Sequence, residues 1–196
     1  MAALIALVAA RPAAAGLIID QQNTTGNTTS SGSYAVGQSF TPTATALDAV
    51  SVMLNVAQGQ SSTIVVDLFQ GDGFGGPLRG SSKPLTITST TLNTYQFNFV
   101  TPITLTPNNT YTLRLTRQGA TSSYGVRYYD GTSPNAPSTY YPGGIFYRSN
   151  GTADPRSELV FAEGIATPEP STLISGGIAV LAGLGCGWRR RARRAA

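Results

Sequence analysis

The chain has 196 residues, of which only 11% are charged, while glycine occurs 22 times and serine, threonine and asparagine are frequent. This length allows one domain with a sizeable core together with terminal segments. The low charge and the many small polar residues are typical of an exported β-rich protein and argue against a cytosolic enzyme.

The formal net charge of +4 comes from the ends of the chain. Residues 17–167 contain seven basic and eight acidic side chains, so this part carries a net charge of −1. Nucleic-acid binding requires a concentrated basic surface. We therefore expect no nucleic-acid partner.

Histidine is absent, and the single cysteine is Cys186. Without histidine the chain cannot form a Ser-His-Asp or Cys-His nucleophile. With one cysteine it can form neither an internal disulfide nor a cysteine-based zinc site. We predict that the protein is not an enzyme and that it has no catalytic residue, no metal site and no cofactor.

The first residues, MAALIALVAARPAAAG, are a short apolar stretch followed by small side chains. This pattern predicts a secretory signal peptide, residues 1–15, with cleavage after Ala15. No basic residue precedes the apolar stretch, which leaves open a longer signal that starts upstream. A buried N-terminal strand or helix is the alternative interpretation.

Residues 16–166 predict strands throughout. The segment DAVSVMLNVA, residues 48–57, alternates apolar and polar side chains, and residues 93–100 and 109–117 show the same period of two. Shorter segments of this kind are YAVGQSF, TIVVDLF, KPLTITS, YGVRYY, GIFYR and SELVFAE. Clusters of glycine, proline, asparagine and aspartate separate them as turns. Strands with one polar face indicate antiparallel sheets that cover a core on one side.

These strands, with no helical pattern between them, predict an all-β ectodomain over residues 16–166. We expect a two-sheet antiparallel sandwich of jelly-roll-like form. An immunoglobulin-like sandwich remains the alternative, because the sequence does not give the strand order. The polar segment QQNTTGNTTSSGS, residues 21–33, is expected to be an exposed loop after the first strand.

Six of the nine tyrosines fall within residues 124–148. An exposed tyrosine offers a flat apolar face and a hydroxyl group, which suit the CH face and the hydroxyls of a sugar. Tyr128 and Tyr129 would point to opposite faces of a strand, so we expect one of them in the core. The alternative is that the rings only cap the sandwich and fill a long loop. The candidate ligand-binding residues are Arg127, Tyr128, Asp130, Tyr140 and Tyr141.

Acidic residues in two segments raise the possibilities of a calcium site and of a glycosidase. Asp72 lies in the turn QGDGFGGP, where a calcium ion could bind with backbone carbonyls, although a tight glycine turn is the preferred interpretation. A glycosidase would need two carboxyl groups that flank one bond. Glu158 and Glu163 are the nearest pair, but their odd separation would place them on opposite faces of a shared strand.

The last residues divide into three parts. Residues 167–172, TPEPST, form a linker that two prolines keep extended. Residues 173–188 are uncharged and apolar, and they predict a single transmembrane helix about 24 Å long against a bilayer core of roughly 30 Å. Residues 189–196 contain five arginines, which predict a basic cytoplasmic tail and an ectodomain outside the cytoplasm.

The order Pro168-Glu169-Pro170, apolar run and terminal arginine cluster resembles the PEP-CTERM sorting signal. The resemblance implies processing by an exosortase, a transpeptidase-like membrane enzyme of Gram-negative bacteria that make exopolysaccharide. Pro168, Glu169 and Pro170 would then be recognition residues of a substrate, not catalytic ones. An ordinary C-terminal anchor with two prolines in its linker is the alternative.

Residues 34–161 resemble, at the level of pattern, a broad group of bacterial surface domains that often precede such anchors. The resemblance lies in VGQSFTPTATALDAVSVML, VDLFQGDGFGGPL and PITLTPNNTYTLRL, and it implies no particular ligand. Because sandwiches of this kind commonly bind sugars, we expect an exported cell-envelope protein with exopolysaccharide as a candidate partner. It would be anchored in the membrane before processing, and release to the extracellular matrix is left open. A passive structural or adhesive role in the matrix and a carboxylate-dependent glycosidase are the alternatives.

Overall fold

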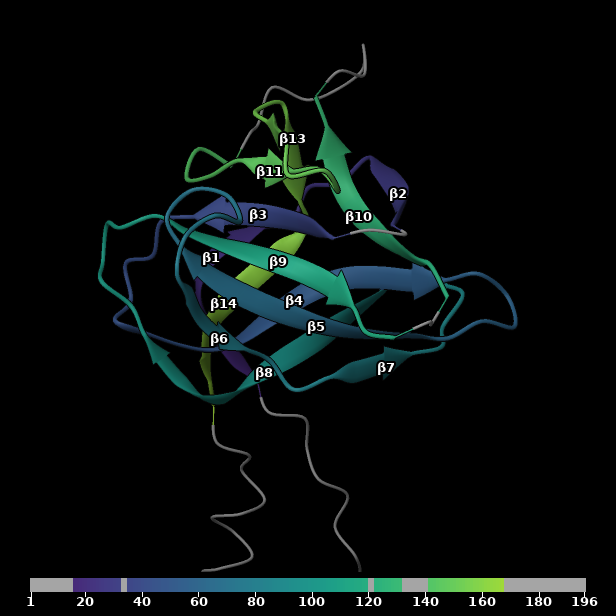
Figure 1. Cartoon of the computed structure of the whole chain (residues 1–196), viewed down its shortest axis with the longest axis horizontal. Coiled ribbons are helices and arrows are strands. Elements are labelled where there is room, and N and C mark those ends of the chain that lie inside the picture. The colour runs from purple at the N-terminus through teal and green to yellow at the C-terminus, as the bar shows by residue number, and fades with distance from the viewer. Residues whose placement is uncertain (1–15, 33–34, 120–121, 132–140, 168–196) are drawn as a thin grey trace, which may run out of the picture. The chain divides into compact units, whose positions relative to one another are not determined.

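Two antiparallel β-sheets face each other in the computed structural model, which describes residues 16–32, 35–119, 122–131 and 141–167 (Figure 1). The strands of the first sheet are β1 (Leu17–Asn23), β2 (Thr28–Gly32), β4 (Ala46–Val56), β8 (Asn93–Thr104), β10 (Tyr124–Asp130), β13 (Ser157–Leu159) and β14 (Phe161–Ala166). The strands of the second are β3 (Val36–Phe40), β5 (Ser62–Gln70), β6 (Leu78–Ser81), β7 (Leu85–Ile87), β9 (Tyr111–Arg117), β11 (Phe146–Tyr147) and β12 (Ala153–Asp154).

The first sheet has the order β1-β14-β4-β10-β13, with β8 beside β4 and β2 beside β10. The second has the order β12-β11-β3-β9-β5-β6, with β7 beside β5. The prediction of an all-β, two-sheet antiparallel fold is confirmed. Among the described residues there is no helix long and apolar enough to span a membrane. The predicted signal peptide, transmembrane helix and basic tail lie outside these residues.

Alternation of side chains explains why these segments form strands. Val50, Val52 and Leu54 of β4 are at most 1% exposed, whereas Ser51 and Met53 between them are partly exposed. Each buried aliphatic side chain of this size contributes about 1.5–3 kcal/mol relative to an exposed one. A shift of the register by one residue would turn this apolar row to solvent, so the alternation also fixes the register.

Aromatic rings fill the core at one end of the sandwich. Phe40 of β3 lies 6.1 Å from the ring of Tyr111 and 6.4 Å from that of Phe161, measured between centroids. All three rings are at most 2% exposed. They join the inner faces of the two sheets, since Phe161 belongs to the first sheet and the other two to the second.

One segment differs from its prediction. The polar stretch that was expected to be a loop contains strand β2, whose residues Thr28–Gly32 pair with Tyr124–Tyr128 of β10. Thr29 is exposed, and its two neighbours are partly exposed. Polar side chains suit this strand because its backbone has a partner while little core lies beneath it.

The first and last strands of the domain are neighbours. Leu17 of β1 is paired with Ala166 of β14, and residues Leu17–Ala166 form one compact unit. A β-bulge between Ile19 and Gln21 interrupts this pairing at Asp20. The chain therefore enters and leaves the domain at one place, at the lower edge of the first sheet in Figure 1.

Candidate functional site

Strand β10 carries three of the residues predicted to bind a ligand. The Nη2 atom of Arg127 donates a hydrogen bond to the carbonyl oxygen of Gly26 at 2.6 Å. The backbone N–H of Asp130 donates to Oδ1 of Asn27 at 2.7 Å, and Nδ2 of Asn27 donates to the carbonyl oxygen of Asp130 at 3.0 Å. These contacts attach β10 to the segment between β1 and β2, and they hold Arg127 against that segment.

The tyrosines of this region pack against the core. Tyr128 stacks on Phe146 with centroids 5.2 Å apart and an interplanar angle of 9°. Tyr141 meets Phe161 edge-on at 5.4 Å, and its hydroxyl donates to Oε1 of Gln21 at 3.0 Å. Burial, together with nearby carboxyl groups, raises the pKa of Tyr141 to about 12, so this hydroxyl stays protonated as a donor. Both rings therefore have structural partners.

The neighbouring Tyr129 is 1% exposed. Thus neither ring of the Tyr128–Tyr129 pair stands free in solvent. Tyr140 and the sorting residues Pro168, Glu169 and Pro170 lie outside the described residues, and their predicted roles stay predictions.

Glu158 and Glu163 do not share one strand, because the chain is divided at Val160. Glu158 belongs to β13, which pairs with β10, and Glu163 belongs to β14, which pairs with β1 and β4. The two side chains are 2% and 0% exposed. Both carboxyl groups contribute to the raised pKa of Tyr141. The expectation of one strand with opposed glutamates is therefore wrong.

Burial raises the pKa of both glutamates to about 8. Glu158 accepts a hydrogen bond from Nε2 of Gln38 at 2.5 Å, which partly opposes this rise. The nearby Asp20 raises the pKa of Glu163 further, and the backbone N–H of Gln21 partly opposes this rise. In its acid form, Glu163 can donate its proton to Asp20. Both glutamates are therefore protonated at neutral pH. Their side chains are buried, so a substrate in solvent could not reach them.

The glycine-rich turn after β5 folds back onto the second sheet. Gly71 and Gly73 have φ values of 94° and 83°, which only glycine adopts without strain. The N–H of Gly73 donates to Oγ1 of Thr112 at 2.9 Å, and that hydroxyl donates to the carbonyl oxygen of Gly71 at 2.7 Å. The predicted glycine turn is confirmed.

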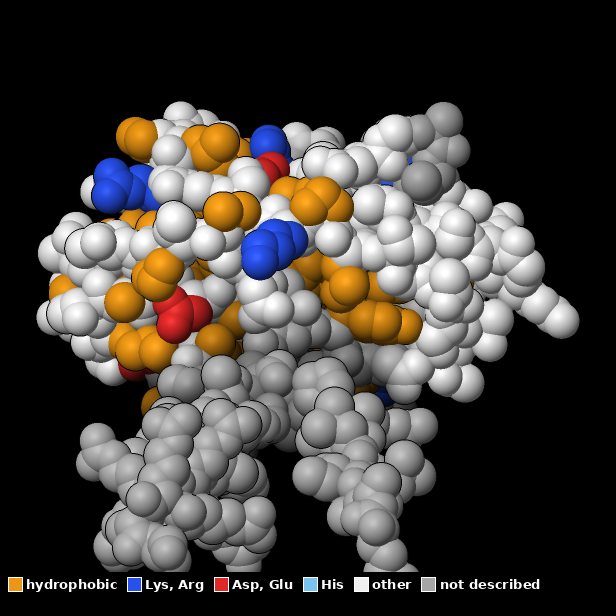
Figure 2. Space-filling model, turned by 90° about the horizontal axis from the view of Figure 1, so that it is seen from below, with side chains coloured by type: hydrophobic (Ala, Val, Ile, Leu, Met, Phe, Trp, Pro, Cys, Tyr) orange, Lys and Arg blue, Asp and Glu red, His pale blue; other side chains and the backbone are white. Residues whose placement is uncertain are grey.

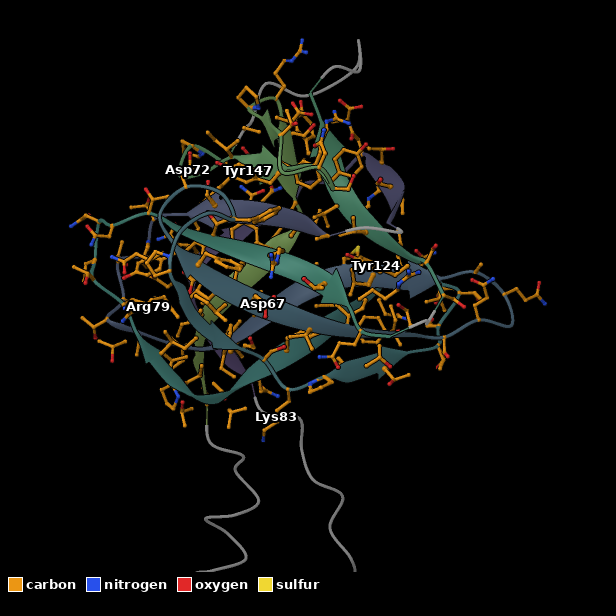
Figure 3. The ribbon with its side chains drawn as sticks, viewed as in Figure 1. Asp67, Asp72, Arg79, Lys83, Tyr124 and Tyr147 are labelled. Carbon is orange, nitrogen blue, oxygen red and sulfur yellow. The ribbon has the colours of Figure 1, made fainter. Side chains whose placement is uncertain are left out.

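Asp72 in this turn lies beside Tyr147, as Figure 3 shows. Burial and the hydrogen bond to Asp72 raise the pKa of the Tyr147 hydroxyl. The part of the chain that the structure describes contains no group of three or more acidic side chains placed to hold a metal ion. Asp72 thus has a protein partner in the tyrosine hydroxyl.

A pocket of about 160 Å³ lies on the outer face of the first sheet. Strands β1, β4, β8 and β14 and the residues beside them form it. Its lining consists of Asn23, Thr24, Ser51, Val52, Met53, Thr94, Val160, Phe161 and Ala162. None of these side chains is ionisable, so the pocket presents apolar groups and neutral hydrogen-bonding groups only.

The pocket combines an apolar floor with a polar rim. The floor is formed by Met53 and Ala162, which are partly exposed, whereas at the rim Thr24 and Thr94 are exposed and Ser51 is partly exposed. Small-molecule sites commonly have such apolar linings with a few polar groups that fix the orientation of the ligand. The arrangement can bind a neutral molecule that has both an apolar face and hydroxyl groups.

One predicted residue lies at the edge of this pocket. A side chain at Gly26 would come within 2.6 Å of Cγ2 of Val160 and 2.9 Å of Cγ of Arg127. The N–H of Val160 also donates to the carbonyl oxygen of Arg127 at 3.1 Å. The structure therefore brings Arg127 beside the pocket, while Tyr128 and Tyr141 do not line it.

Sequence reasoning missed the pocket, although one signal was present. Met53 is an apolar side chain on the face of β4 that otherwise carries Ser51 and Asn55. Such a residue on a polar face indicates a local apolar surface. Comparison with known proteins finds no matching family model and no matching curated protein. The function must therefore be argued from the site.

Proposed function

We propose that this chain is an exported, non-catalytic protein of the bacterial cell envelope whose sandwich binds neutral carbohydrate at the pocket on the outer face of the first sheet. It is sorted through the C-terminal Pro-Glu-Pro signal, and residues 173–188 anchor it in the membrane before processing. The observation that carries the binding proposal is the uncharged pocket with its apolar floor and polar rim. The ligand class is the neutral part of the cell's own exopolysaccharide.

The chemistry of a sugar ring matches this lining. The CH groups of the ring can lie on Met53 and Ala162, which are partly exposed, while its hydroxyls can exchange hydrogen bonds with Ser51 and Thr94. An anionic polymer would need a cation in the pocket; the lining has none, and the guanidinium of Arg127 beside it donates to the carbonyl oxygen of Gly26. A glycosidase would need two carboxyl groups at the bond. The lining of the pocket contains no carboxyl group, which supports a binding role.

The jelly-roll-like form of the sandwich is part of the proposal. The long strands alternate between the sheets along the chain, with β3, β5 and β9 in the second sheet and β4, β8 and β10 in the first. This alternation is typical of jelly rolls, in which successive strands cross between two sheets.

Thr94→Arg is expected to reduce carbohydrate binding at least tenfold, because its long cationic side chain would occupy the pocket. The matched control is Thr104→Arg, since Thr104 is also an exposed threonine of β8 and does not line the pocket. The measurement is titration calorimetry of residues 16–167 with purified exopolysaccharide from the producing cells. Equal affinity of the two variants would remove the pocket from the proposal.

A loss of binding in the Tyr140→Ala, Tyr141→Ala variant alone would move the site to the tyrosine segment. If the parent domain does not bind the polymer, the passive matrix role takes the place of the binding role. The packing of Tyr141 between Gln21 and Phe161 favours that second function over display of this ring.

Replacing Pro168, Glu169 and Pro170 together by alanine is expected to abolish C-terminal processing. In the producing cells the parent chain should lose its tail, whereas the triple variant should stay at full length in the membrane fraction. Immunoblots of cell fractions with an antibody to the domain measure both properties. The control is Ser171→Ala with Thr172→Ala, which leaves the motif intact. Normal processing of the triple variant would contradict the assignment of these recognition residues.

A further inference from the structure

The exposed hydrophobic side chains of the domain are concentrated at one end. Five large hydrophobic residues are exposed in the described part of the chain. Four of them are Ile18, Ile19, Val100 and Ile165, with exposed fractions of 61%, 47%, 70% and 37%. We name these four residues the isoleucine end, and the fifth, Leu78, is not part of it.

The strand register places the isoleucine end on neighbouring strands. Ile18 of β1 is paired with Ile165 of β14. Ile19 begins the next row, which continues through Gly164 of β14 and Ala49 of β4 to Asn98 of β8.

Val100 follows two residues after Asn98, at the point where the pairing of β8 with β4 shifts its register. All four residues therefore lie at the end of the first sheet where β1 begins and β14 ends (Figure 1), with Ile19 and Val100 on one face and Ile18 and Ile165 on the other. Figure 2 views the molecule from this lower side and shows hydrophobic side chains at several places on it.

Two aspartates, Asp20 and Asp48, lie near the isoleucine end, but their carboxylates do not face an apolar partner. Oδ2 of Asp48 accepts a hydrogen bond from the N–H of Ala166 at 3.2 Å, and its Oδ1 is buried. Asp20 accepts hydrogen bonds from the backbone N–H groups of Thr43 and Ala44 at 2.7 and 3.0 Å. Both carboxylates are thus turned toward protein donors.

The side chain of Lys83 is exposed at the same end, as Figure 3 shows, and the backbone N–H of this residue donates to the carbonyl oxygen of Asn98 at 2.9 Å. A lysine beside exposed aliphatic side chains suits the interface of a membrane with anionic headgroups.

The length of the following chain limits how far this end can lie from a membrane. Ala166 is the last residue of β14, and the apolar run begins at Leu173. The six residues between them span at most about 20 Å when fully extended. If the run enters a bilayer, the isoleucine end is the part of the domain held nearest to it.

We propose that the isoleucine end rests on the lipid surface of the membrane, with its four aliphatic side chains among the headgroups and Lys83 at the anionic phosphates. The inference rests on the proposed membrane anchor and deepens it, because it assigns a lipid-contacting face to the ectodomain. Burial of this apolar area in the interface supplies the attraction.

The test uses the full chain with Cys186→Ser, reconstituted in vesicles of phosphatidylcholine and phosphatidylglycerol at a ratio of about 3 to 1, a composition chosen for its negative surface. Spin labels are attached in separate variants at Ile18→Cys and Val100→Cys. The matched control is Gln60→Cys, an exposed site in the turn beyond the other end of β4. Accessibility to oxygen and to a water-soluble nickel complex is measured for each label by electron paramagnetic resonance.

We expect the labels at 18 and 100 to be at least threefold less accessible to the nickel complex than the label at 60. Vesicle flotation of the same samples separates the two proposals. Chains that float with vesicles but whose three labels are equally accessible to the nickel complex overturn the lipid-contacting face and leave the anchor in place. Chains that do not float overturn the anchor and the lipid-contacting face together.

Discussion

Raising the pH from 5 to 9 is expected to lower the melting temperature of the domain by roughly 20 °C, because two buried glutamates must lose their protons. The pKa of Glu158 and of Glu163 is about 8 in the folded domain, against an ordinary value of 4.5. Between these values the folded state binds a proton that the unfolded state has released. Stability therefore falls as the pH rises from 4.5 to 8, and these two groups cause no further fall above it.

The aspartates with lowered pKa values act in the opposite direction. For Asp20 and Asp154, the hydrogen bonds that each carboxylate accepts outweigh the opposing effect of burial and lower the pKa below its ordinary value of 3.8. Their contribution to stability is complete above 3.8 and is lost as the pH falls through the folded pKa. We therefore expect the highest melting temperature near pH 4–5, with a decline on both sides.

Glu163→Gln separates the contribution of this residue from that of Glu158. The amide stays neutral, so the variant should be about 5 kcal/mol more stable than the parent at pH 9 and of similar stability at pH 4.5. Gln60→Glu is the control, since it adds an exposed carboxyl group in a turn and should leave the difference in stability between the two pH values unchanged. The measurement is chemical unfolding at each pH. A parent domain with equal stability at pH 5 and pH 9 would rule out buried protonated glutamates.

The sequence predicted the parts of the fold that depend on local patterning. In β4, β8 and β9 the alternation of side chains decides which face is buried, and no distant partner is needed to recognise it. Strand β2 could not be recognised in this way. Its residues Thr28–Gly32 are polar on both faces, and they form a strand only because β10 supplies backbone partners about a hundred residues later.

Two interruptions were also invisible in the sequence. The division of the last segment at Val160 arises because β13 pairs with β10 while β14 pairs with β1 and β4. The bulge at Asp20 depends in the same way on the pairing of β1 with β14. The division at Val160 and the bulge at Asp20 both follow from strand pairings between distant parts of the chain. Both also decide which acidic side chains turn inward.

The candidate site could not be predicted from local patterning either. Its lining comes from segments near residues 23, 51, 94 and 160, which only the strand order brings together. The composition of residues 124–148 drew attention to the tyrosines, of which Tyr128 and Tyr141 turned out to have partners in the core. Of the predicted residues, Arg127 lies beside the pocket, and its position there follows from its contact with Gly26.

Gln38→Leu is expected to destabilise the domain by about 2–4 kcal/mol, because it removes a buried link between the two sheets. Gln38 belongs to β3 of the second sheet and is 0% exposed. Its Nε2 donates to Oε2 of Glu158 at 2.5 Å, and its Oε1 accepts from the N–H of Leu159 at 2.8 Å. The leucine fits the volume but leaves a buried carboxyl group and a buried N–H without these partners.

Gln96→Leu is the matched control, since the hydrogen bond from Gln96 to Asn98 is exposed and its loss should cost less than about 0.5 kcal/mol. The double variant Gln38→Leu, Glu158→Leu should be more stable than the sum of the two single variants predicts, because it removes both members of the buried pair. Urea unfolding of the four variants measures these free energies. Strict additivity would show that Gln38 and Glu158 do not act as a pair.

The same pair connects stability to pH. The hydrogen bond from Gln38 lowers the pKa of Glu158, so its removal should raise that pKa and extend the loss of stability to higher pH. A purely steric effect of leucine would lower stability equally at all pH values. The shift of the pH profile in Gln38→Leu therefore distinguishes loss of this hydrogen bond from a general disturbance of the core.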